Sequence, residues 1–166
     1  MFGFFHSTGD GDPAERRPLY YFLIVSLGVG ALASLFTEPN IPVWYADLVH
    51  PAFAPPAFLF APVWTALYVV MGVAGWLVWK KTGLQSAEMA AFALQLALNL
   101  AWTALFFGLH RMGAALAALA LLDLAALAAL LLFLRRSKAA GLLEVPCLGW
   151  SGFTTGLVYE IWRLNP

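Results

Sequence analysis

The side chains best placed to bind a ligand are aromatic and amide groups inside long apolar segments. In "AFALQLALNLAWTALFFG", residues 91–108, a helical step of 100° places Gln95, Asn99, Trp102 and Phe106 on one face. In an earlier apolar segment, Trp64 and Tyr68 are one helical turn apart. Aromatic rings with a few polar groups among them are typical of a site for a flat, mostly apolar molecule.

Residue patterns for other chemistry are absent from the sequence. The motifs HExxH, CxxC, GxSxG and GxxxxGK[ST] do not occur, and His6, His50 and His110 fall in a predicted tail and two predicted loops. The one cysteine lies in an apolar segment and excludes an internal disulfide. The sequence therefore predicts no catalytic residue, no metal site and no obligatory cofactor.

Composition indicates a membrane protein. Of the 166 residues, 62% are hydrophobic and 11% are charged, against about 25% charged residues in a typical soluble domain. The mean hydropathy is +0.80. Nine basic and nine acidic residues give no net charge, so there is no basic field to hold nucleic acid.

Five apolar segments are long enough to cross a membrane as helices, at about 20 residues each. We therefore predict an all-α, polytopic membrane protein that forms a bundle of five transmembrane helices. A disordered polar tail, residues 1–17, would precede a single domain, residues 18–166, whose first loop covers 38–57. The predicted spans are 18–37, 58–79, 87–109, 113–134 and 141–163.

The basic residues indicate how the five spans are oriented. If the spans alternate in direction, seven basic residues lie on the side of the N-terminus and two on the other. This bias places the N-terminus in the cytoplasm of a bacterial cell and the first loop outside. The seven are Arg16, Arg17, Lys80, Lys81, Arg135, Arg136 and Lys138, and the two are Arg111 and Arg163.

Counting along the helices from the tight third loop gives the depth of the polar residues. Asn99 and Asp123 each lie about twelve residues from that loop, roughly 17–18 Å deep at 1.5 Å per residue. Asp123 is interpreted as the one acid deep inside a span. It is either functional, with Gln95 as further polar support, or a protonated packing residue bonded to a neighbour such as Asn99. Trp150, in the fifth span, lies close to mid-depth.

A row of small residues lies nearly opposite the aromatic face of the third span. Ala93, Ala97 and Ala101 are spaced by four, which permits close approach of two helices in lipid. The row is either a dimer contact or a contact within the monomer, and the sequence favours neither.

Four sequence blocks together resemble the translocator protein family, also called tryptophan-rich sensory proteins or peripheral benzodiazepine receptors. They cover about residues 38–166 in the family's order, and the first span matches more loosely. The blocks are "WYADLVHPAFAPP", "PVWTALYVVMGVAGWLVWK", "QLALNLAWTALFFG" and "VPCLGWSGFTTGLVYEIWRLNP".

The resemblance implies a homodimeric five-helix bundle in membrane lipid, with a cavity that opens toward the first loop. The implied ligands are porphyrins, such as protoporphyrin IX or haem-like molecules, and other flat hydrophobic molecules. This chain departs from the family in the first loop. Where relatives commonly have two tryptophans and a lysine, it has Phe53, Phe58 and His50. By matching positions, the implied ligand pocket consists of Tyr45, Pro55, Trp64, Tyr68, Asn99, Trp102, Phe106 and Trp150.

Three functions are compatible with such a pocket. The leading hypothesis is a sensor or carrier that binds porphyrin-type tetrapyrroles without chemistry of its own. The second is an enzyme that degrades the bound porphyrin with light or oxygen, and the third is a transporter of tetrapyrroles or lipid.

The prolines of the first loop indicate a semi-rigid lid. Pro55 and Pro56 lack a backbone N–H and have a fixed φ, so they stiffen the segment that leads into the second span. We expect Phe53 and Phe58 to form the apolar underside of this lid, facing the cavity.

Overall fold

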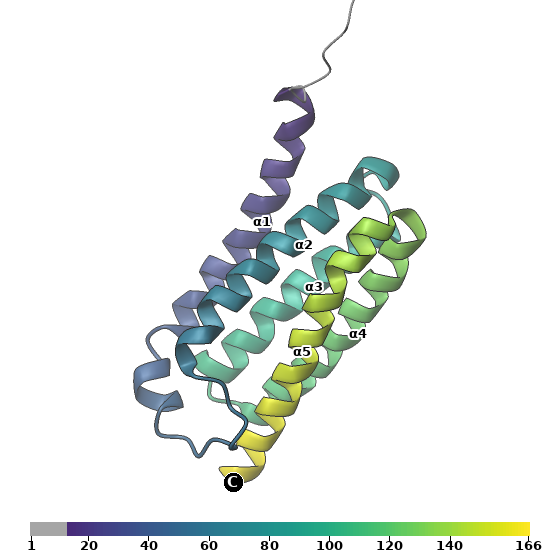
Figure 1. Ribbon diagram of the computed structural model, residues 1–166. Coiled ribbons are helices and arrows are strands. Elements are labelled where there is room, and N and C mark those ends of the chain that lie inside the picture. Colours follow the sequence, from purple (N-terminus) through teal and green to yellow (C-terminus); the bar gives the residue numbers. More distant parts are fainter. Residues whose placement is uncertain (1–12) are drawn as a thin grey trace, which may run out of the picture.

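The computed structural model describes residues 13–166, with side chains from Arg17 onward. Within this range the chain forms long α-helices that lie side by side, with the connections confined to the two ends (Figure 1). The all-α class is therefore confirmed. The helices are α1 (Pro13–Thr37), α2 (Phe60–Thr82), α3 (Ala87–Thr103), α4 (Met112–Arg136) and α5 (Lys138–Leu164).

Four helical segments in the described part of the chain are long and apolar enough to cross a membrane: Arg17–Thr37, Ala57–Thr82, Ala87–Gly108 and Met112–Arg136. The protein is thus an integral membrane protein. Helix α5 lies along α4 but carries Glu144 and Glu160 and is not among the four. The fifth span, and with it the orientation of the N-terminus, stays a prediction.

The first helix begins earlier than the sequence predicted. Residues 1–12 of the expected tail lie outside the described residues, but α1 already starts at Pro13. Proline is well tolerated in the first turn of a helix, where its missing N–H has no partner to lose. The N-terminal turns of α1 extend past the ends of the other helices (Figure 1).

The connection between α3 and α4 is as short as predicted. Helix α3 continues into a π-helical turn, η3 (Ala104–Gly108), in which the N–H of Leu109 donates to the carbonyl of Ala104 at 2.9 Å. His110 follows with a φ of 53°, in the left-handed region, and α4 begins at Met112. The wider turn brings both Phe106 and Phe107 into the interior.

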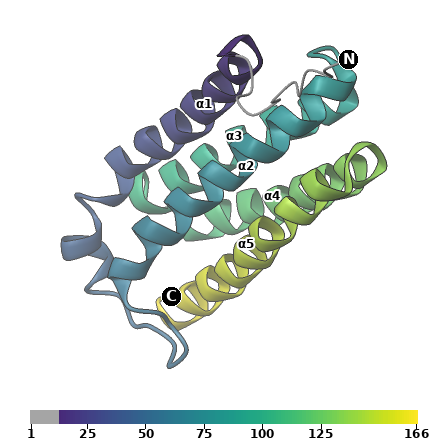
Figure 2. The same ribbon diagram turned by 45° about the horizontal axis from the view of Figure 1, so that its top comes forward.

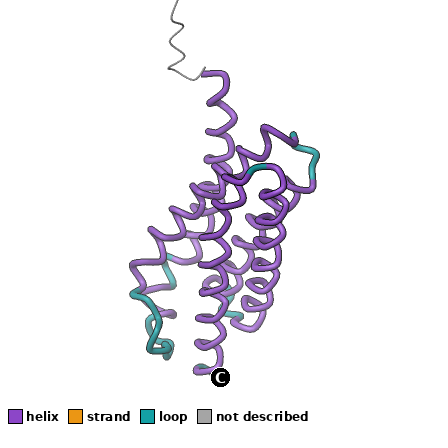
Figure 3. The backbone as a smooth tube through the Cα atoms, turned by 45° about the vertical axis from the view of Figure 1, so that its right-hand side comes forward, coloured by secondary structure: helices purple, strands orange, loops and turns teal. Residues whose placement is uncertain are grey.

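The first loop folds over one end of the bundle, beside the C-terminus (Figures 1 and 2). It contains a π-helical turn, η1 (Ile41–Tyr45), and a 3₁₀ turn, η2 (Ala57–Leu59), and it forms the longest non-helical connection in Figure 3. Its position follows from two sets of contacts with distant parts of the chain.

One set ties the loop to the end of α5. The Asn165 side chain accepts a hydrogen bond from the N–H of Val49 at 2.9 Å and donates one to the carbonyl of Val49 at 3.0 Å. The other set ties it to the α3–α4 connection. There the ring of His110 stacks on Trp44, with centroids 4.2 Å apart, and lies 3.0 Å from Oδ1 of Asn40.

The expected apolar underside of the loop is not present. Phe58 is 73% exposed, and Phe53 is 53% exposed with its ring against Phe153. The prediction that both phenylalanines face the cavity is therefore wrong. Because η2 turns the chain into α2, it directs Phe58 outward, while Phe60 turns inward.

We predict that Asn165→Ala loosens the loop without unfolding the bundle, because it removes both hydrogen bonds to Val49. Amide exchange at Val49 should become faster in hydrogen–deuterium exchange of the detergent-solubilised protein, while α2 and α4 keep their protection. Arg163→Ala is the matched control, since its ion pair with Glu160 does not contact the loop. Equal acceleration in both variants would contradict a specific role for Asn165.

Candidate functional site

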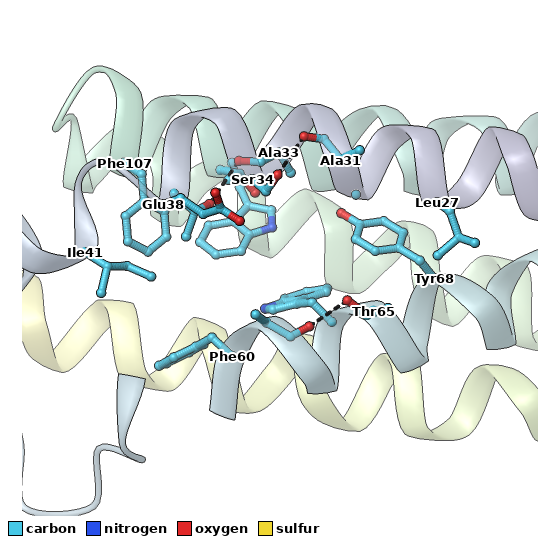
Figure 4. A pocket seen from close by; sticks show the side chains of 16 residues that line it. Leu27, Ala31, Ala33, Ser34, Glu38, Ile41, Phe60, Thr65, Tyr68 and Phe107 are labelled. Carbon is cyan, nitrogen blue, oxygen red and sulfur yellow. Dashed lines mark hydrogen bonds between the residues drawn. The ribbon is translucent and has the colours of Figure 1, made fainter. Parts of the chain in front are cut away.

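A cavity of about 340 Å³ lies between α1, α2 and the end of α3. It extends from Leu27 and Tyr68 at one end to Glu38, Ile41 and Phe107 at the first-loop end (Figure 4). Its volume is at the lower end of the range of about 300–1,000 Å³ that is usual for small-molecule sites. The lining residues are Leu27, Gly30, Ala31, Ala33, Ser34, Thr37, Glu38, Ile41, Phe60, Ala61, Trp64, Thr65, Tyr68, Trp102, Thr103 and Phe107.

The α1 wall of the cavity is built from small side chains. The stretch "GVGALAS", residues 28–34, places Gly30, Ala31, Ala33 and Ser34 on this wall. A Cβ added at Gly30 would come within 2.6 Å of Cδ2 of Tyr68, so only glycine leaves room for that ring. The small face of α1 therefore leaves space where a leucine-rich helix would fill it.

The opposite wall is aromatic. The rings of Trp64 and Trp102 are 5.7 Å apart at an angle of 37°, and Tyr68 follows Trp64 at 6.2 Å. These tilted, offset contacts are favourable geometries for aromatic pairs. They give a continuous wall across α2 and α3, and the structure brings together these three predicted site residues.

Trp64 also borders a second, much smaller cavity of about 10 Å³ among α2, α3, α4 and α5. Two of the predicted polar residues, Gln95 and Asn99, line it, each only 2% exposed. Nε2 of Gln95 donates to Oε2 of Glu144 at 3.0 Å and lies 3.1 Å from Sδ of Met71. The Trp64 side chain thus lies between the large apolar cavity and a buried polar group.

Glu144 corrects the sequence interpretation of Asp123 as the one acid deep in a span. Its side chain is completely buried, and Gln95 is its hydrogen-bond partner. Its Oε1 atom, like Oε1 of Gln95 and Oδ1 of Asn99, has no partner among the described residues. Glu144 lies near the start of the fifth predicted span, residues 141–163, so the sequence did not indicate that its side chain is deeply buried.

Asp123 lies apart from this group. Its Oδ2 atom accepts a hydrogen bond from the Thr155 hydroxyl at 2.7 Å, across α4 and α5. Asn99 instead donates to the carbonyl of Gln95 in its own helix at 3.3 Å. The expected pairing of Asp123 with Asn99 is therefore not formed, because α5 supplies a nearer donor.

Four of the predicted pocket residues line neither cavity. Tyr45 packs against Phe60, Phe106 and Phe107, and burial raises the pKa of its phenol to about 12. Phe106 is 1% exposed beneath Trp44 and Tyr45. These side chains anchor the first loop. The other two are Pro55, half-buried in that loop, and Trp150, which packs against Phe60 and Phe153.

The row of alanines on α3 lies at the surface of the monomer. Ala93 and Ala97 are exposed and Ala101 is half-buried. The face of α3 that carries Ala93 and Ala97 is therefore open to lipid or to a second subunit.

Several lining residues were not indicated by the sequence patterns. The small residues of the α1 wall lie in the first predicted span. Glu38 lies at the start of the predicted first loop, and Phe60 lies at the start of the second predicted span. The cluster of small residues in "GVGALAS" is the signal that could have identified the α1 wall. No group of three His, Cys, Asp or Glu residues within the described range is placed to hold a metal ion.

Comparisons with known proteins agree on one family. The TspO/MBR family profile matches residues 22–163. The chain is 42% identical over 144 residues to the tryptophan-rich protein TspO of Chlorobaculum tepidum, covering 84% of this chain and 90% of that protein. It is 42% identical over 127 residues to the translocator protein of Homo sapiens, covering 74% and 75%. It is 36% identical over 147 residues to the tryptophan-rich sensory protein of Cereibacter sphaeroides, covering 89% and 91%.

We predict that Gln95 and Glu144 are strongly coupled in stability. Gln95→Leu leaves a buried carboxyl group without its donor and should cost about 1–3 kcal/mol or more of the free energy of unfolding. Adding Glu144→Leu should recover most of this loss, because two apolar side chains of similar size need no partners. Unfolding in mixed micelles of dodecyl maltoside and dodecyl sulfate, followed by tryptophan fluorescence, measures each variant.

Gln95→Leu with Thr155→Val is the control pair, since these residues share no partner and their effects should add. A double variant of Gln95 and Glu144 that loses the full sum of the two single losses would contradict the coupling.

Proposed function

Because the chain belongs to the TspO/MBR family, we propose that it binds porphyrin-type tetrapyrroles and similar flat hydrophobic molecules. The site of binding is the cavity between α1 and the aromatic wall of α2 and α3. The protein acts as a sensor or carrier in a bacterial cell membrane, with the first loop outside and the N-terminus in the cytoplasm. Porphyrin is a ligand in this proposal and not an obligatory cofactor.

The observation that carries the proposal is the pairing of a small-residue wall with an aromatic wall. A planar ring system can lie against Trp64 and Trp102 while the small side chains of α1 leave it space. Aromatic rings and small apolar side chains dominate the lining, so binding of a planar apolar molecule is the function that this geometry supports best.

The first loop and the dimer fit the same proposal. Loop residues Glu38 and Ile41 border the cavity, so a movement of the loop changes access to it. We also propose that the Ala93, Ala97 and Ala101 row is the contact of a homodimer. Small residues spaced by four on an exposed helix face permit close packing in lipid.

We predict that Trp64→Phe and Trp102→Phe weaken the binding of protoporphyrin IX, each by about fivefold, because the loss of an indole removes stacking area worth on the order of 1 kcal/mol. Trp150→Phe should change the dissociation constant by less than about twofold, since Trp150 does not line the cavity. Porphyrin fluorescence, titrated in dodecyl maltoside, gives the constants. Equal effects of all three substitutions would move the site away from the α1–α2 cavity.

A further inference from the structure

Five hydroxyl groups line the large cavity, and all except that of Tyr68 use their hydrogens inside the protein. Four of them donate to a backbone carbonyl one turn earlier in their own helix, so that only lone pairs remain for a ligand. The bonds are Ser34 to Ala31 at 2.8 Å, Thr37 to Ala33 at 2.9 Å, Thr65 to Ala61 at 2.8 Å and Thr103 to Asn99 at 2.8 Å.

The charge in the cavity has one sign. Glu38 is the charged residue among the sixteen lining residues, and none of them is basic. Its carboxylate projects over the first-loop end of the cavity, near Phe107 (Figure 4). Glu38 takes part in neither of the ion pairs found among the described residues, so no basic side chain within that range pairs with its carboxylate.

The aromatic wall adds to the negative electrostatic potential of the cavity. The face of an aromatic ring carries partial negative charge and attracts a cation that lies within about 6 Å of the centroid. Trp64 and Trp102 form the deeper part of the wall, and the Glu38 carboxylate lies at its outer end. The aromatic faces, the hydroxyl lone pairs and the carboxylate all favour the same kind of ligand group.

We propose that this cavity selects flat aromatic molecules that carry a protonated nitrogen over neutral or carboxylate-bearing analogues. The nitrogen lies toward Glu38 and the ring system against Trp64 and Trp102. This inference rests on the proposed function, since it specifies the charge of the ligand in the same cavity. A porphyrin dicarboxylate must then bind with its carboxylates away from the Glu38 carboxylate, because like charges repel.

Three acridines of similar shape separate charge from ring binding. At about pH 8, 9-aminoacridine is a cation, acridine is neutral and acridine-9-carboxylate is an anion. Each is titrated against the full chain in uncharged dodecyl maltoside micelles, and quenching of tryptophan fluorescence gives the dissociation constant. The variants are Glu38→Gln and the control Asp47→Asn, which removes the same charge from an exposed position of the same loop that does not line the cavity.

We expect the wild-type protein to bind the cation most tightly and the anion most weakly. Glu38→Gln should weaken the binding of 9-aminoacridine by about fivefold and change that of acridine by less than about twofold. Asp47→Asn should change neither by more than about twofold.

Two results would overturn the charge preference alone: equal losses for acridine and 9-aminoacridine in Glu38→Gln, or an anion that the wild type binds as tightly as the cation. Failure of the proposed function gives a different result. In that case the dissociation constants of all three acridines would be the same in wild type and in the variant that combines Trp64→Phe with Trp102→Phe, which overturns the site and the charge preference together.

Discussion

The site depends on a steric mismatch between two helix faces. Helices in lipid associate by close packing of their side chains, because lipid tails are as apolar as the helices themselves. Helix α1 presents small residues toward α2 and α3. The facing side chains of α2 and α3 are the large rings of Trp64, Tyr68 and Trp102. Neither face can fill the space between them, and the cavity of about 340 Å³ is the result. The contact between Trp64 and Trp102 joins the α2 and α3 parts of the aromatic wall.

Two polar features fix the ends of this arrangement. At the loop end, Asn165 binds the backbone of Val49, and His110 stacks on Trp44, so the loop is held against the end of the bundle. Further in, the Gln95–Glu144 hydrogen bond joins α3 to α5 behind Trp64. A buried carboxyl group in a membrane helix is costly and is stable only with a partner. The pair thus joins α5 to α3, the helix that carries Trp102 of the aromatic wall.

Much of the fold and part of the site could be predicted from the sequence. Apolar segments of about 20 residues identified the helices, helical spacing placed Trp64 and Tyr68 together, and the resemblance added Trp102 to the same pocket. The α1 wall could not be predicted in this way, because small residues in a first span have no distinctive period. Tyr45 and Phe106 were placed in the pocket by resemblance, but the π-helical turns at η1 and η3 rotate them into the packing beneath the loop. The partner of Asp123 depended on which residue of α5 faces α4, and no local pattern encodes that contact.

The central claim is that the ligand occupies the space beside α1, and cysteine protection tests it most directly. In a chain with Cys147→Ala, a single cysteine replaces either Ala31, which lines the cavity, or Val43, which is exposed in the first loop and does not line it. The rate of labelling by a maleimide is measured with and without saturating protoporphyrin IX. Protection of the cysteine at position 31 by severalfold, with an unchanged rate at position 43, is the predicted result. Labelling at position 31 that is unaffected by a bound porphyrin would contradict the account.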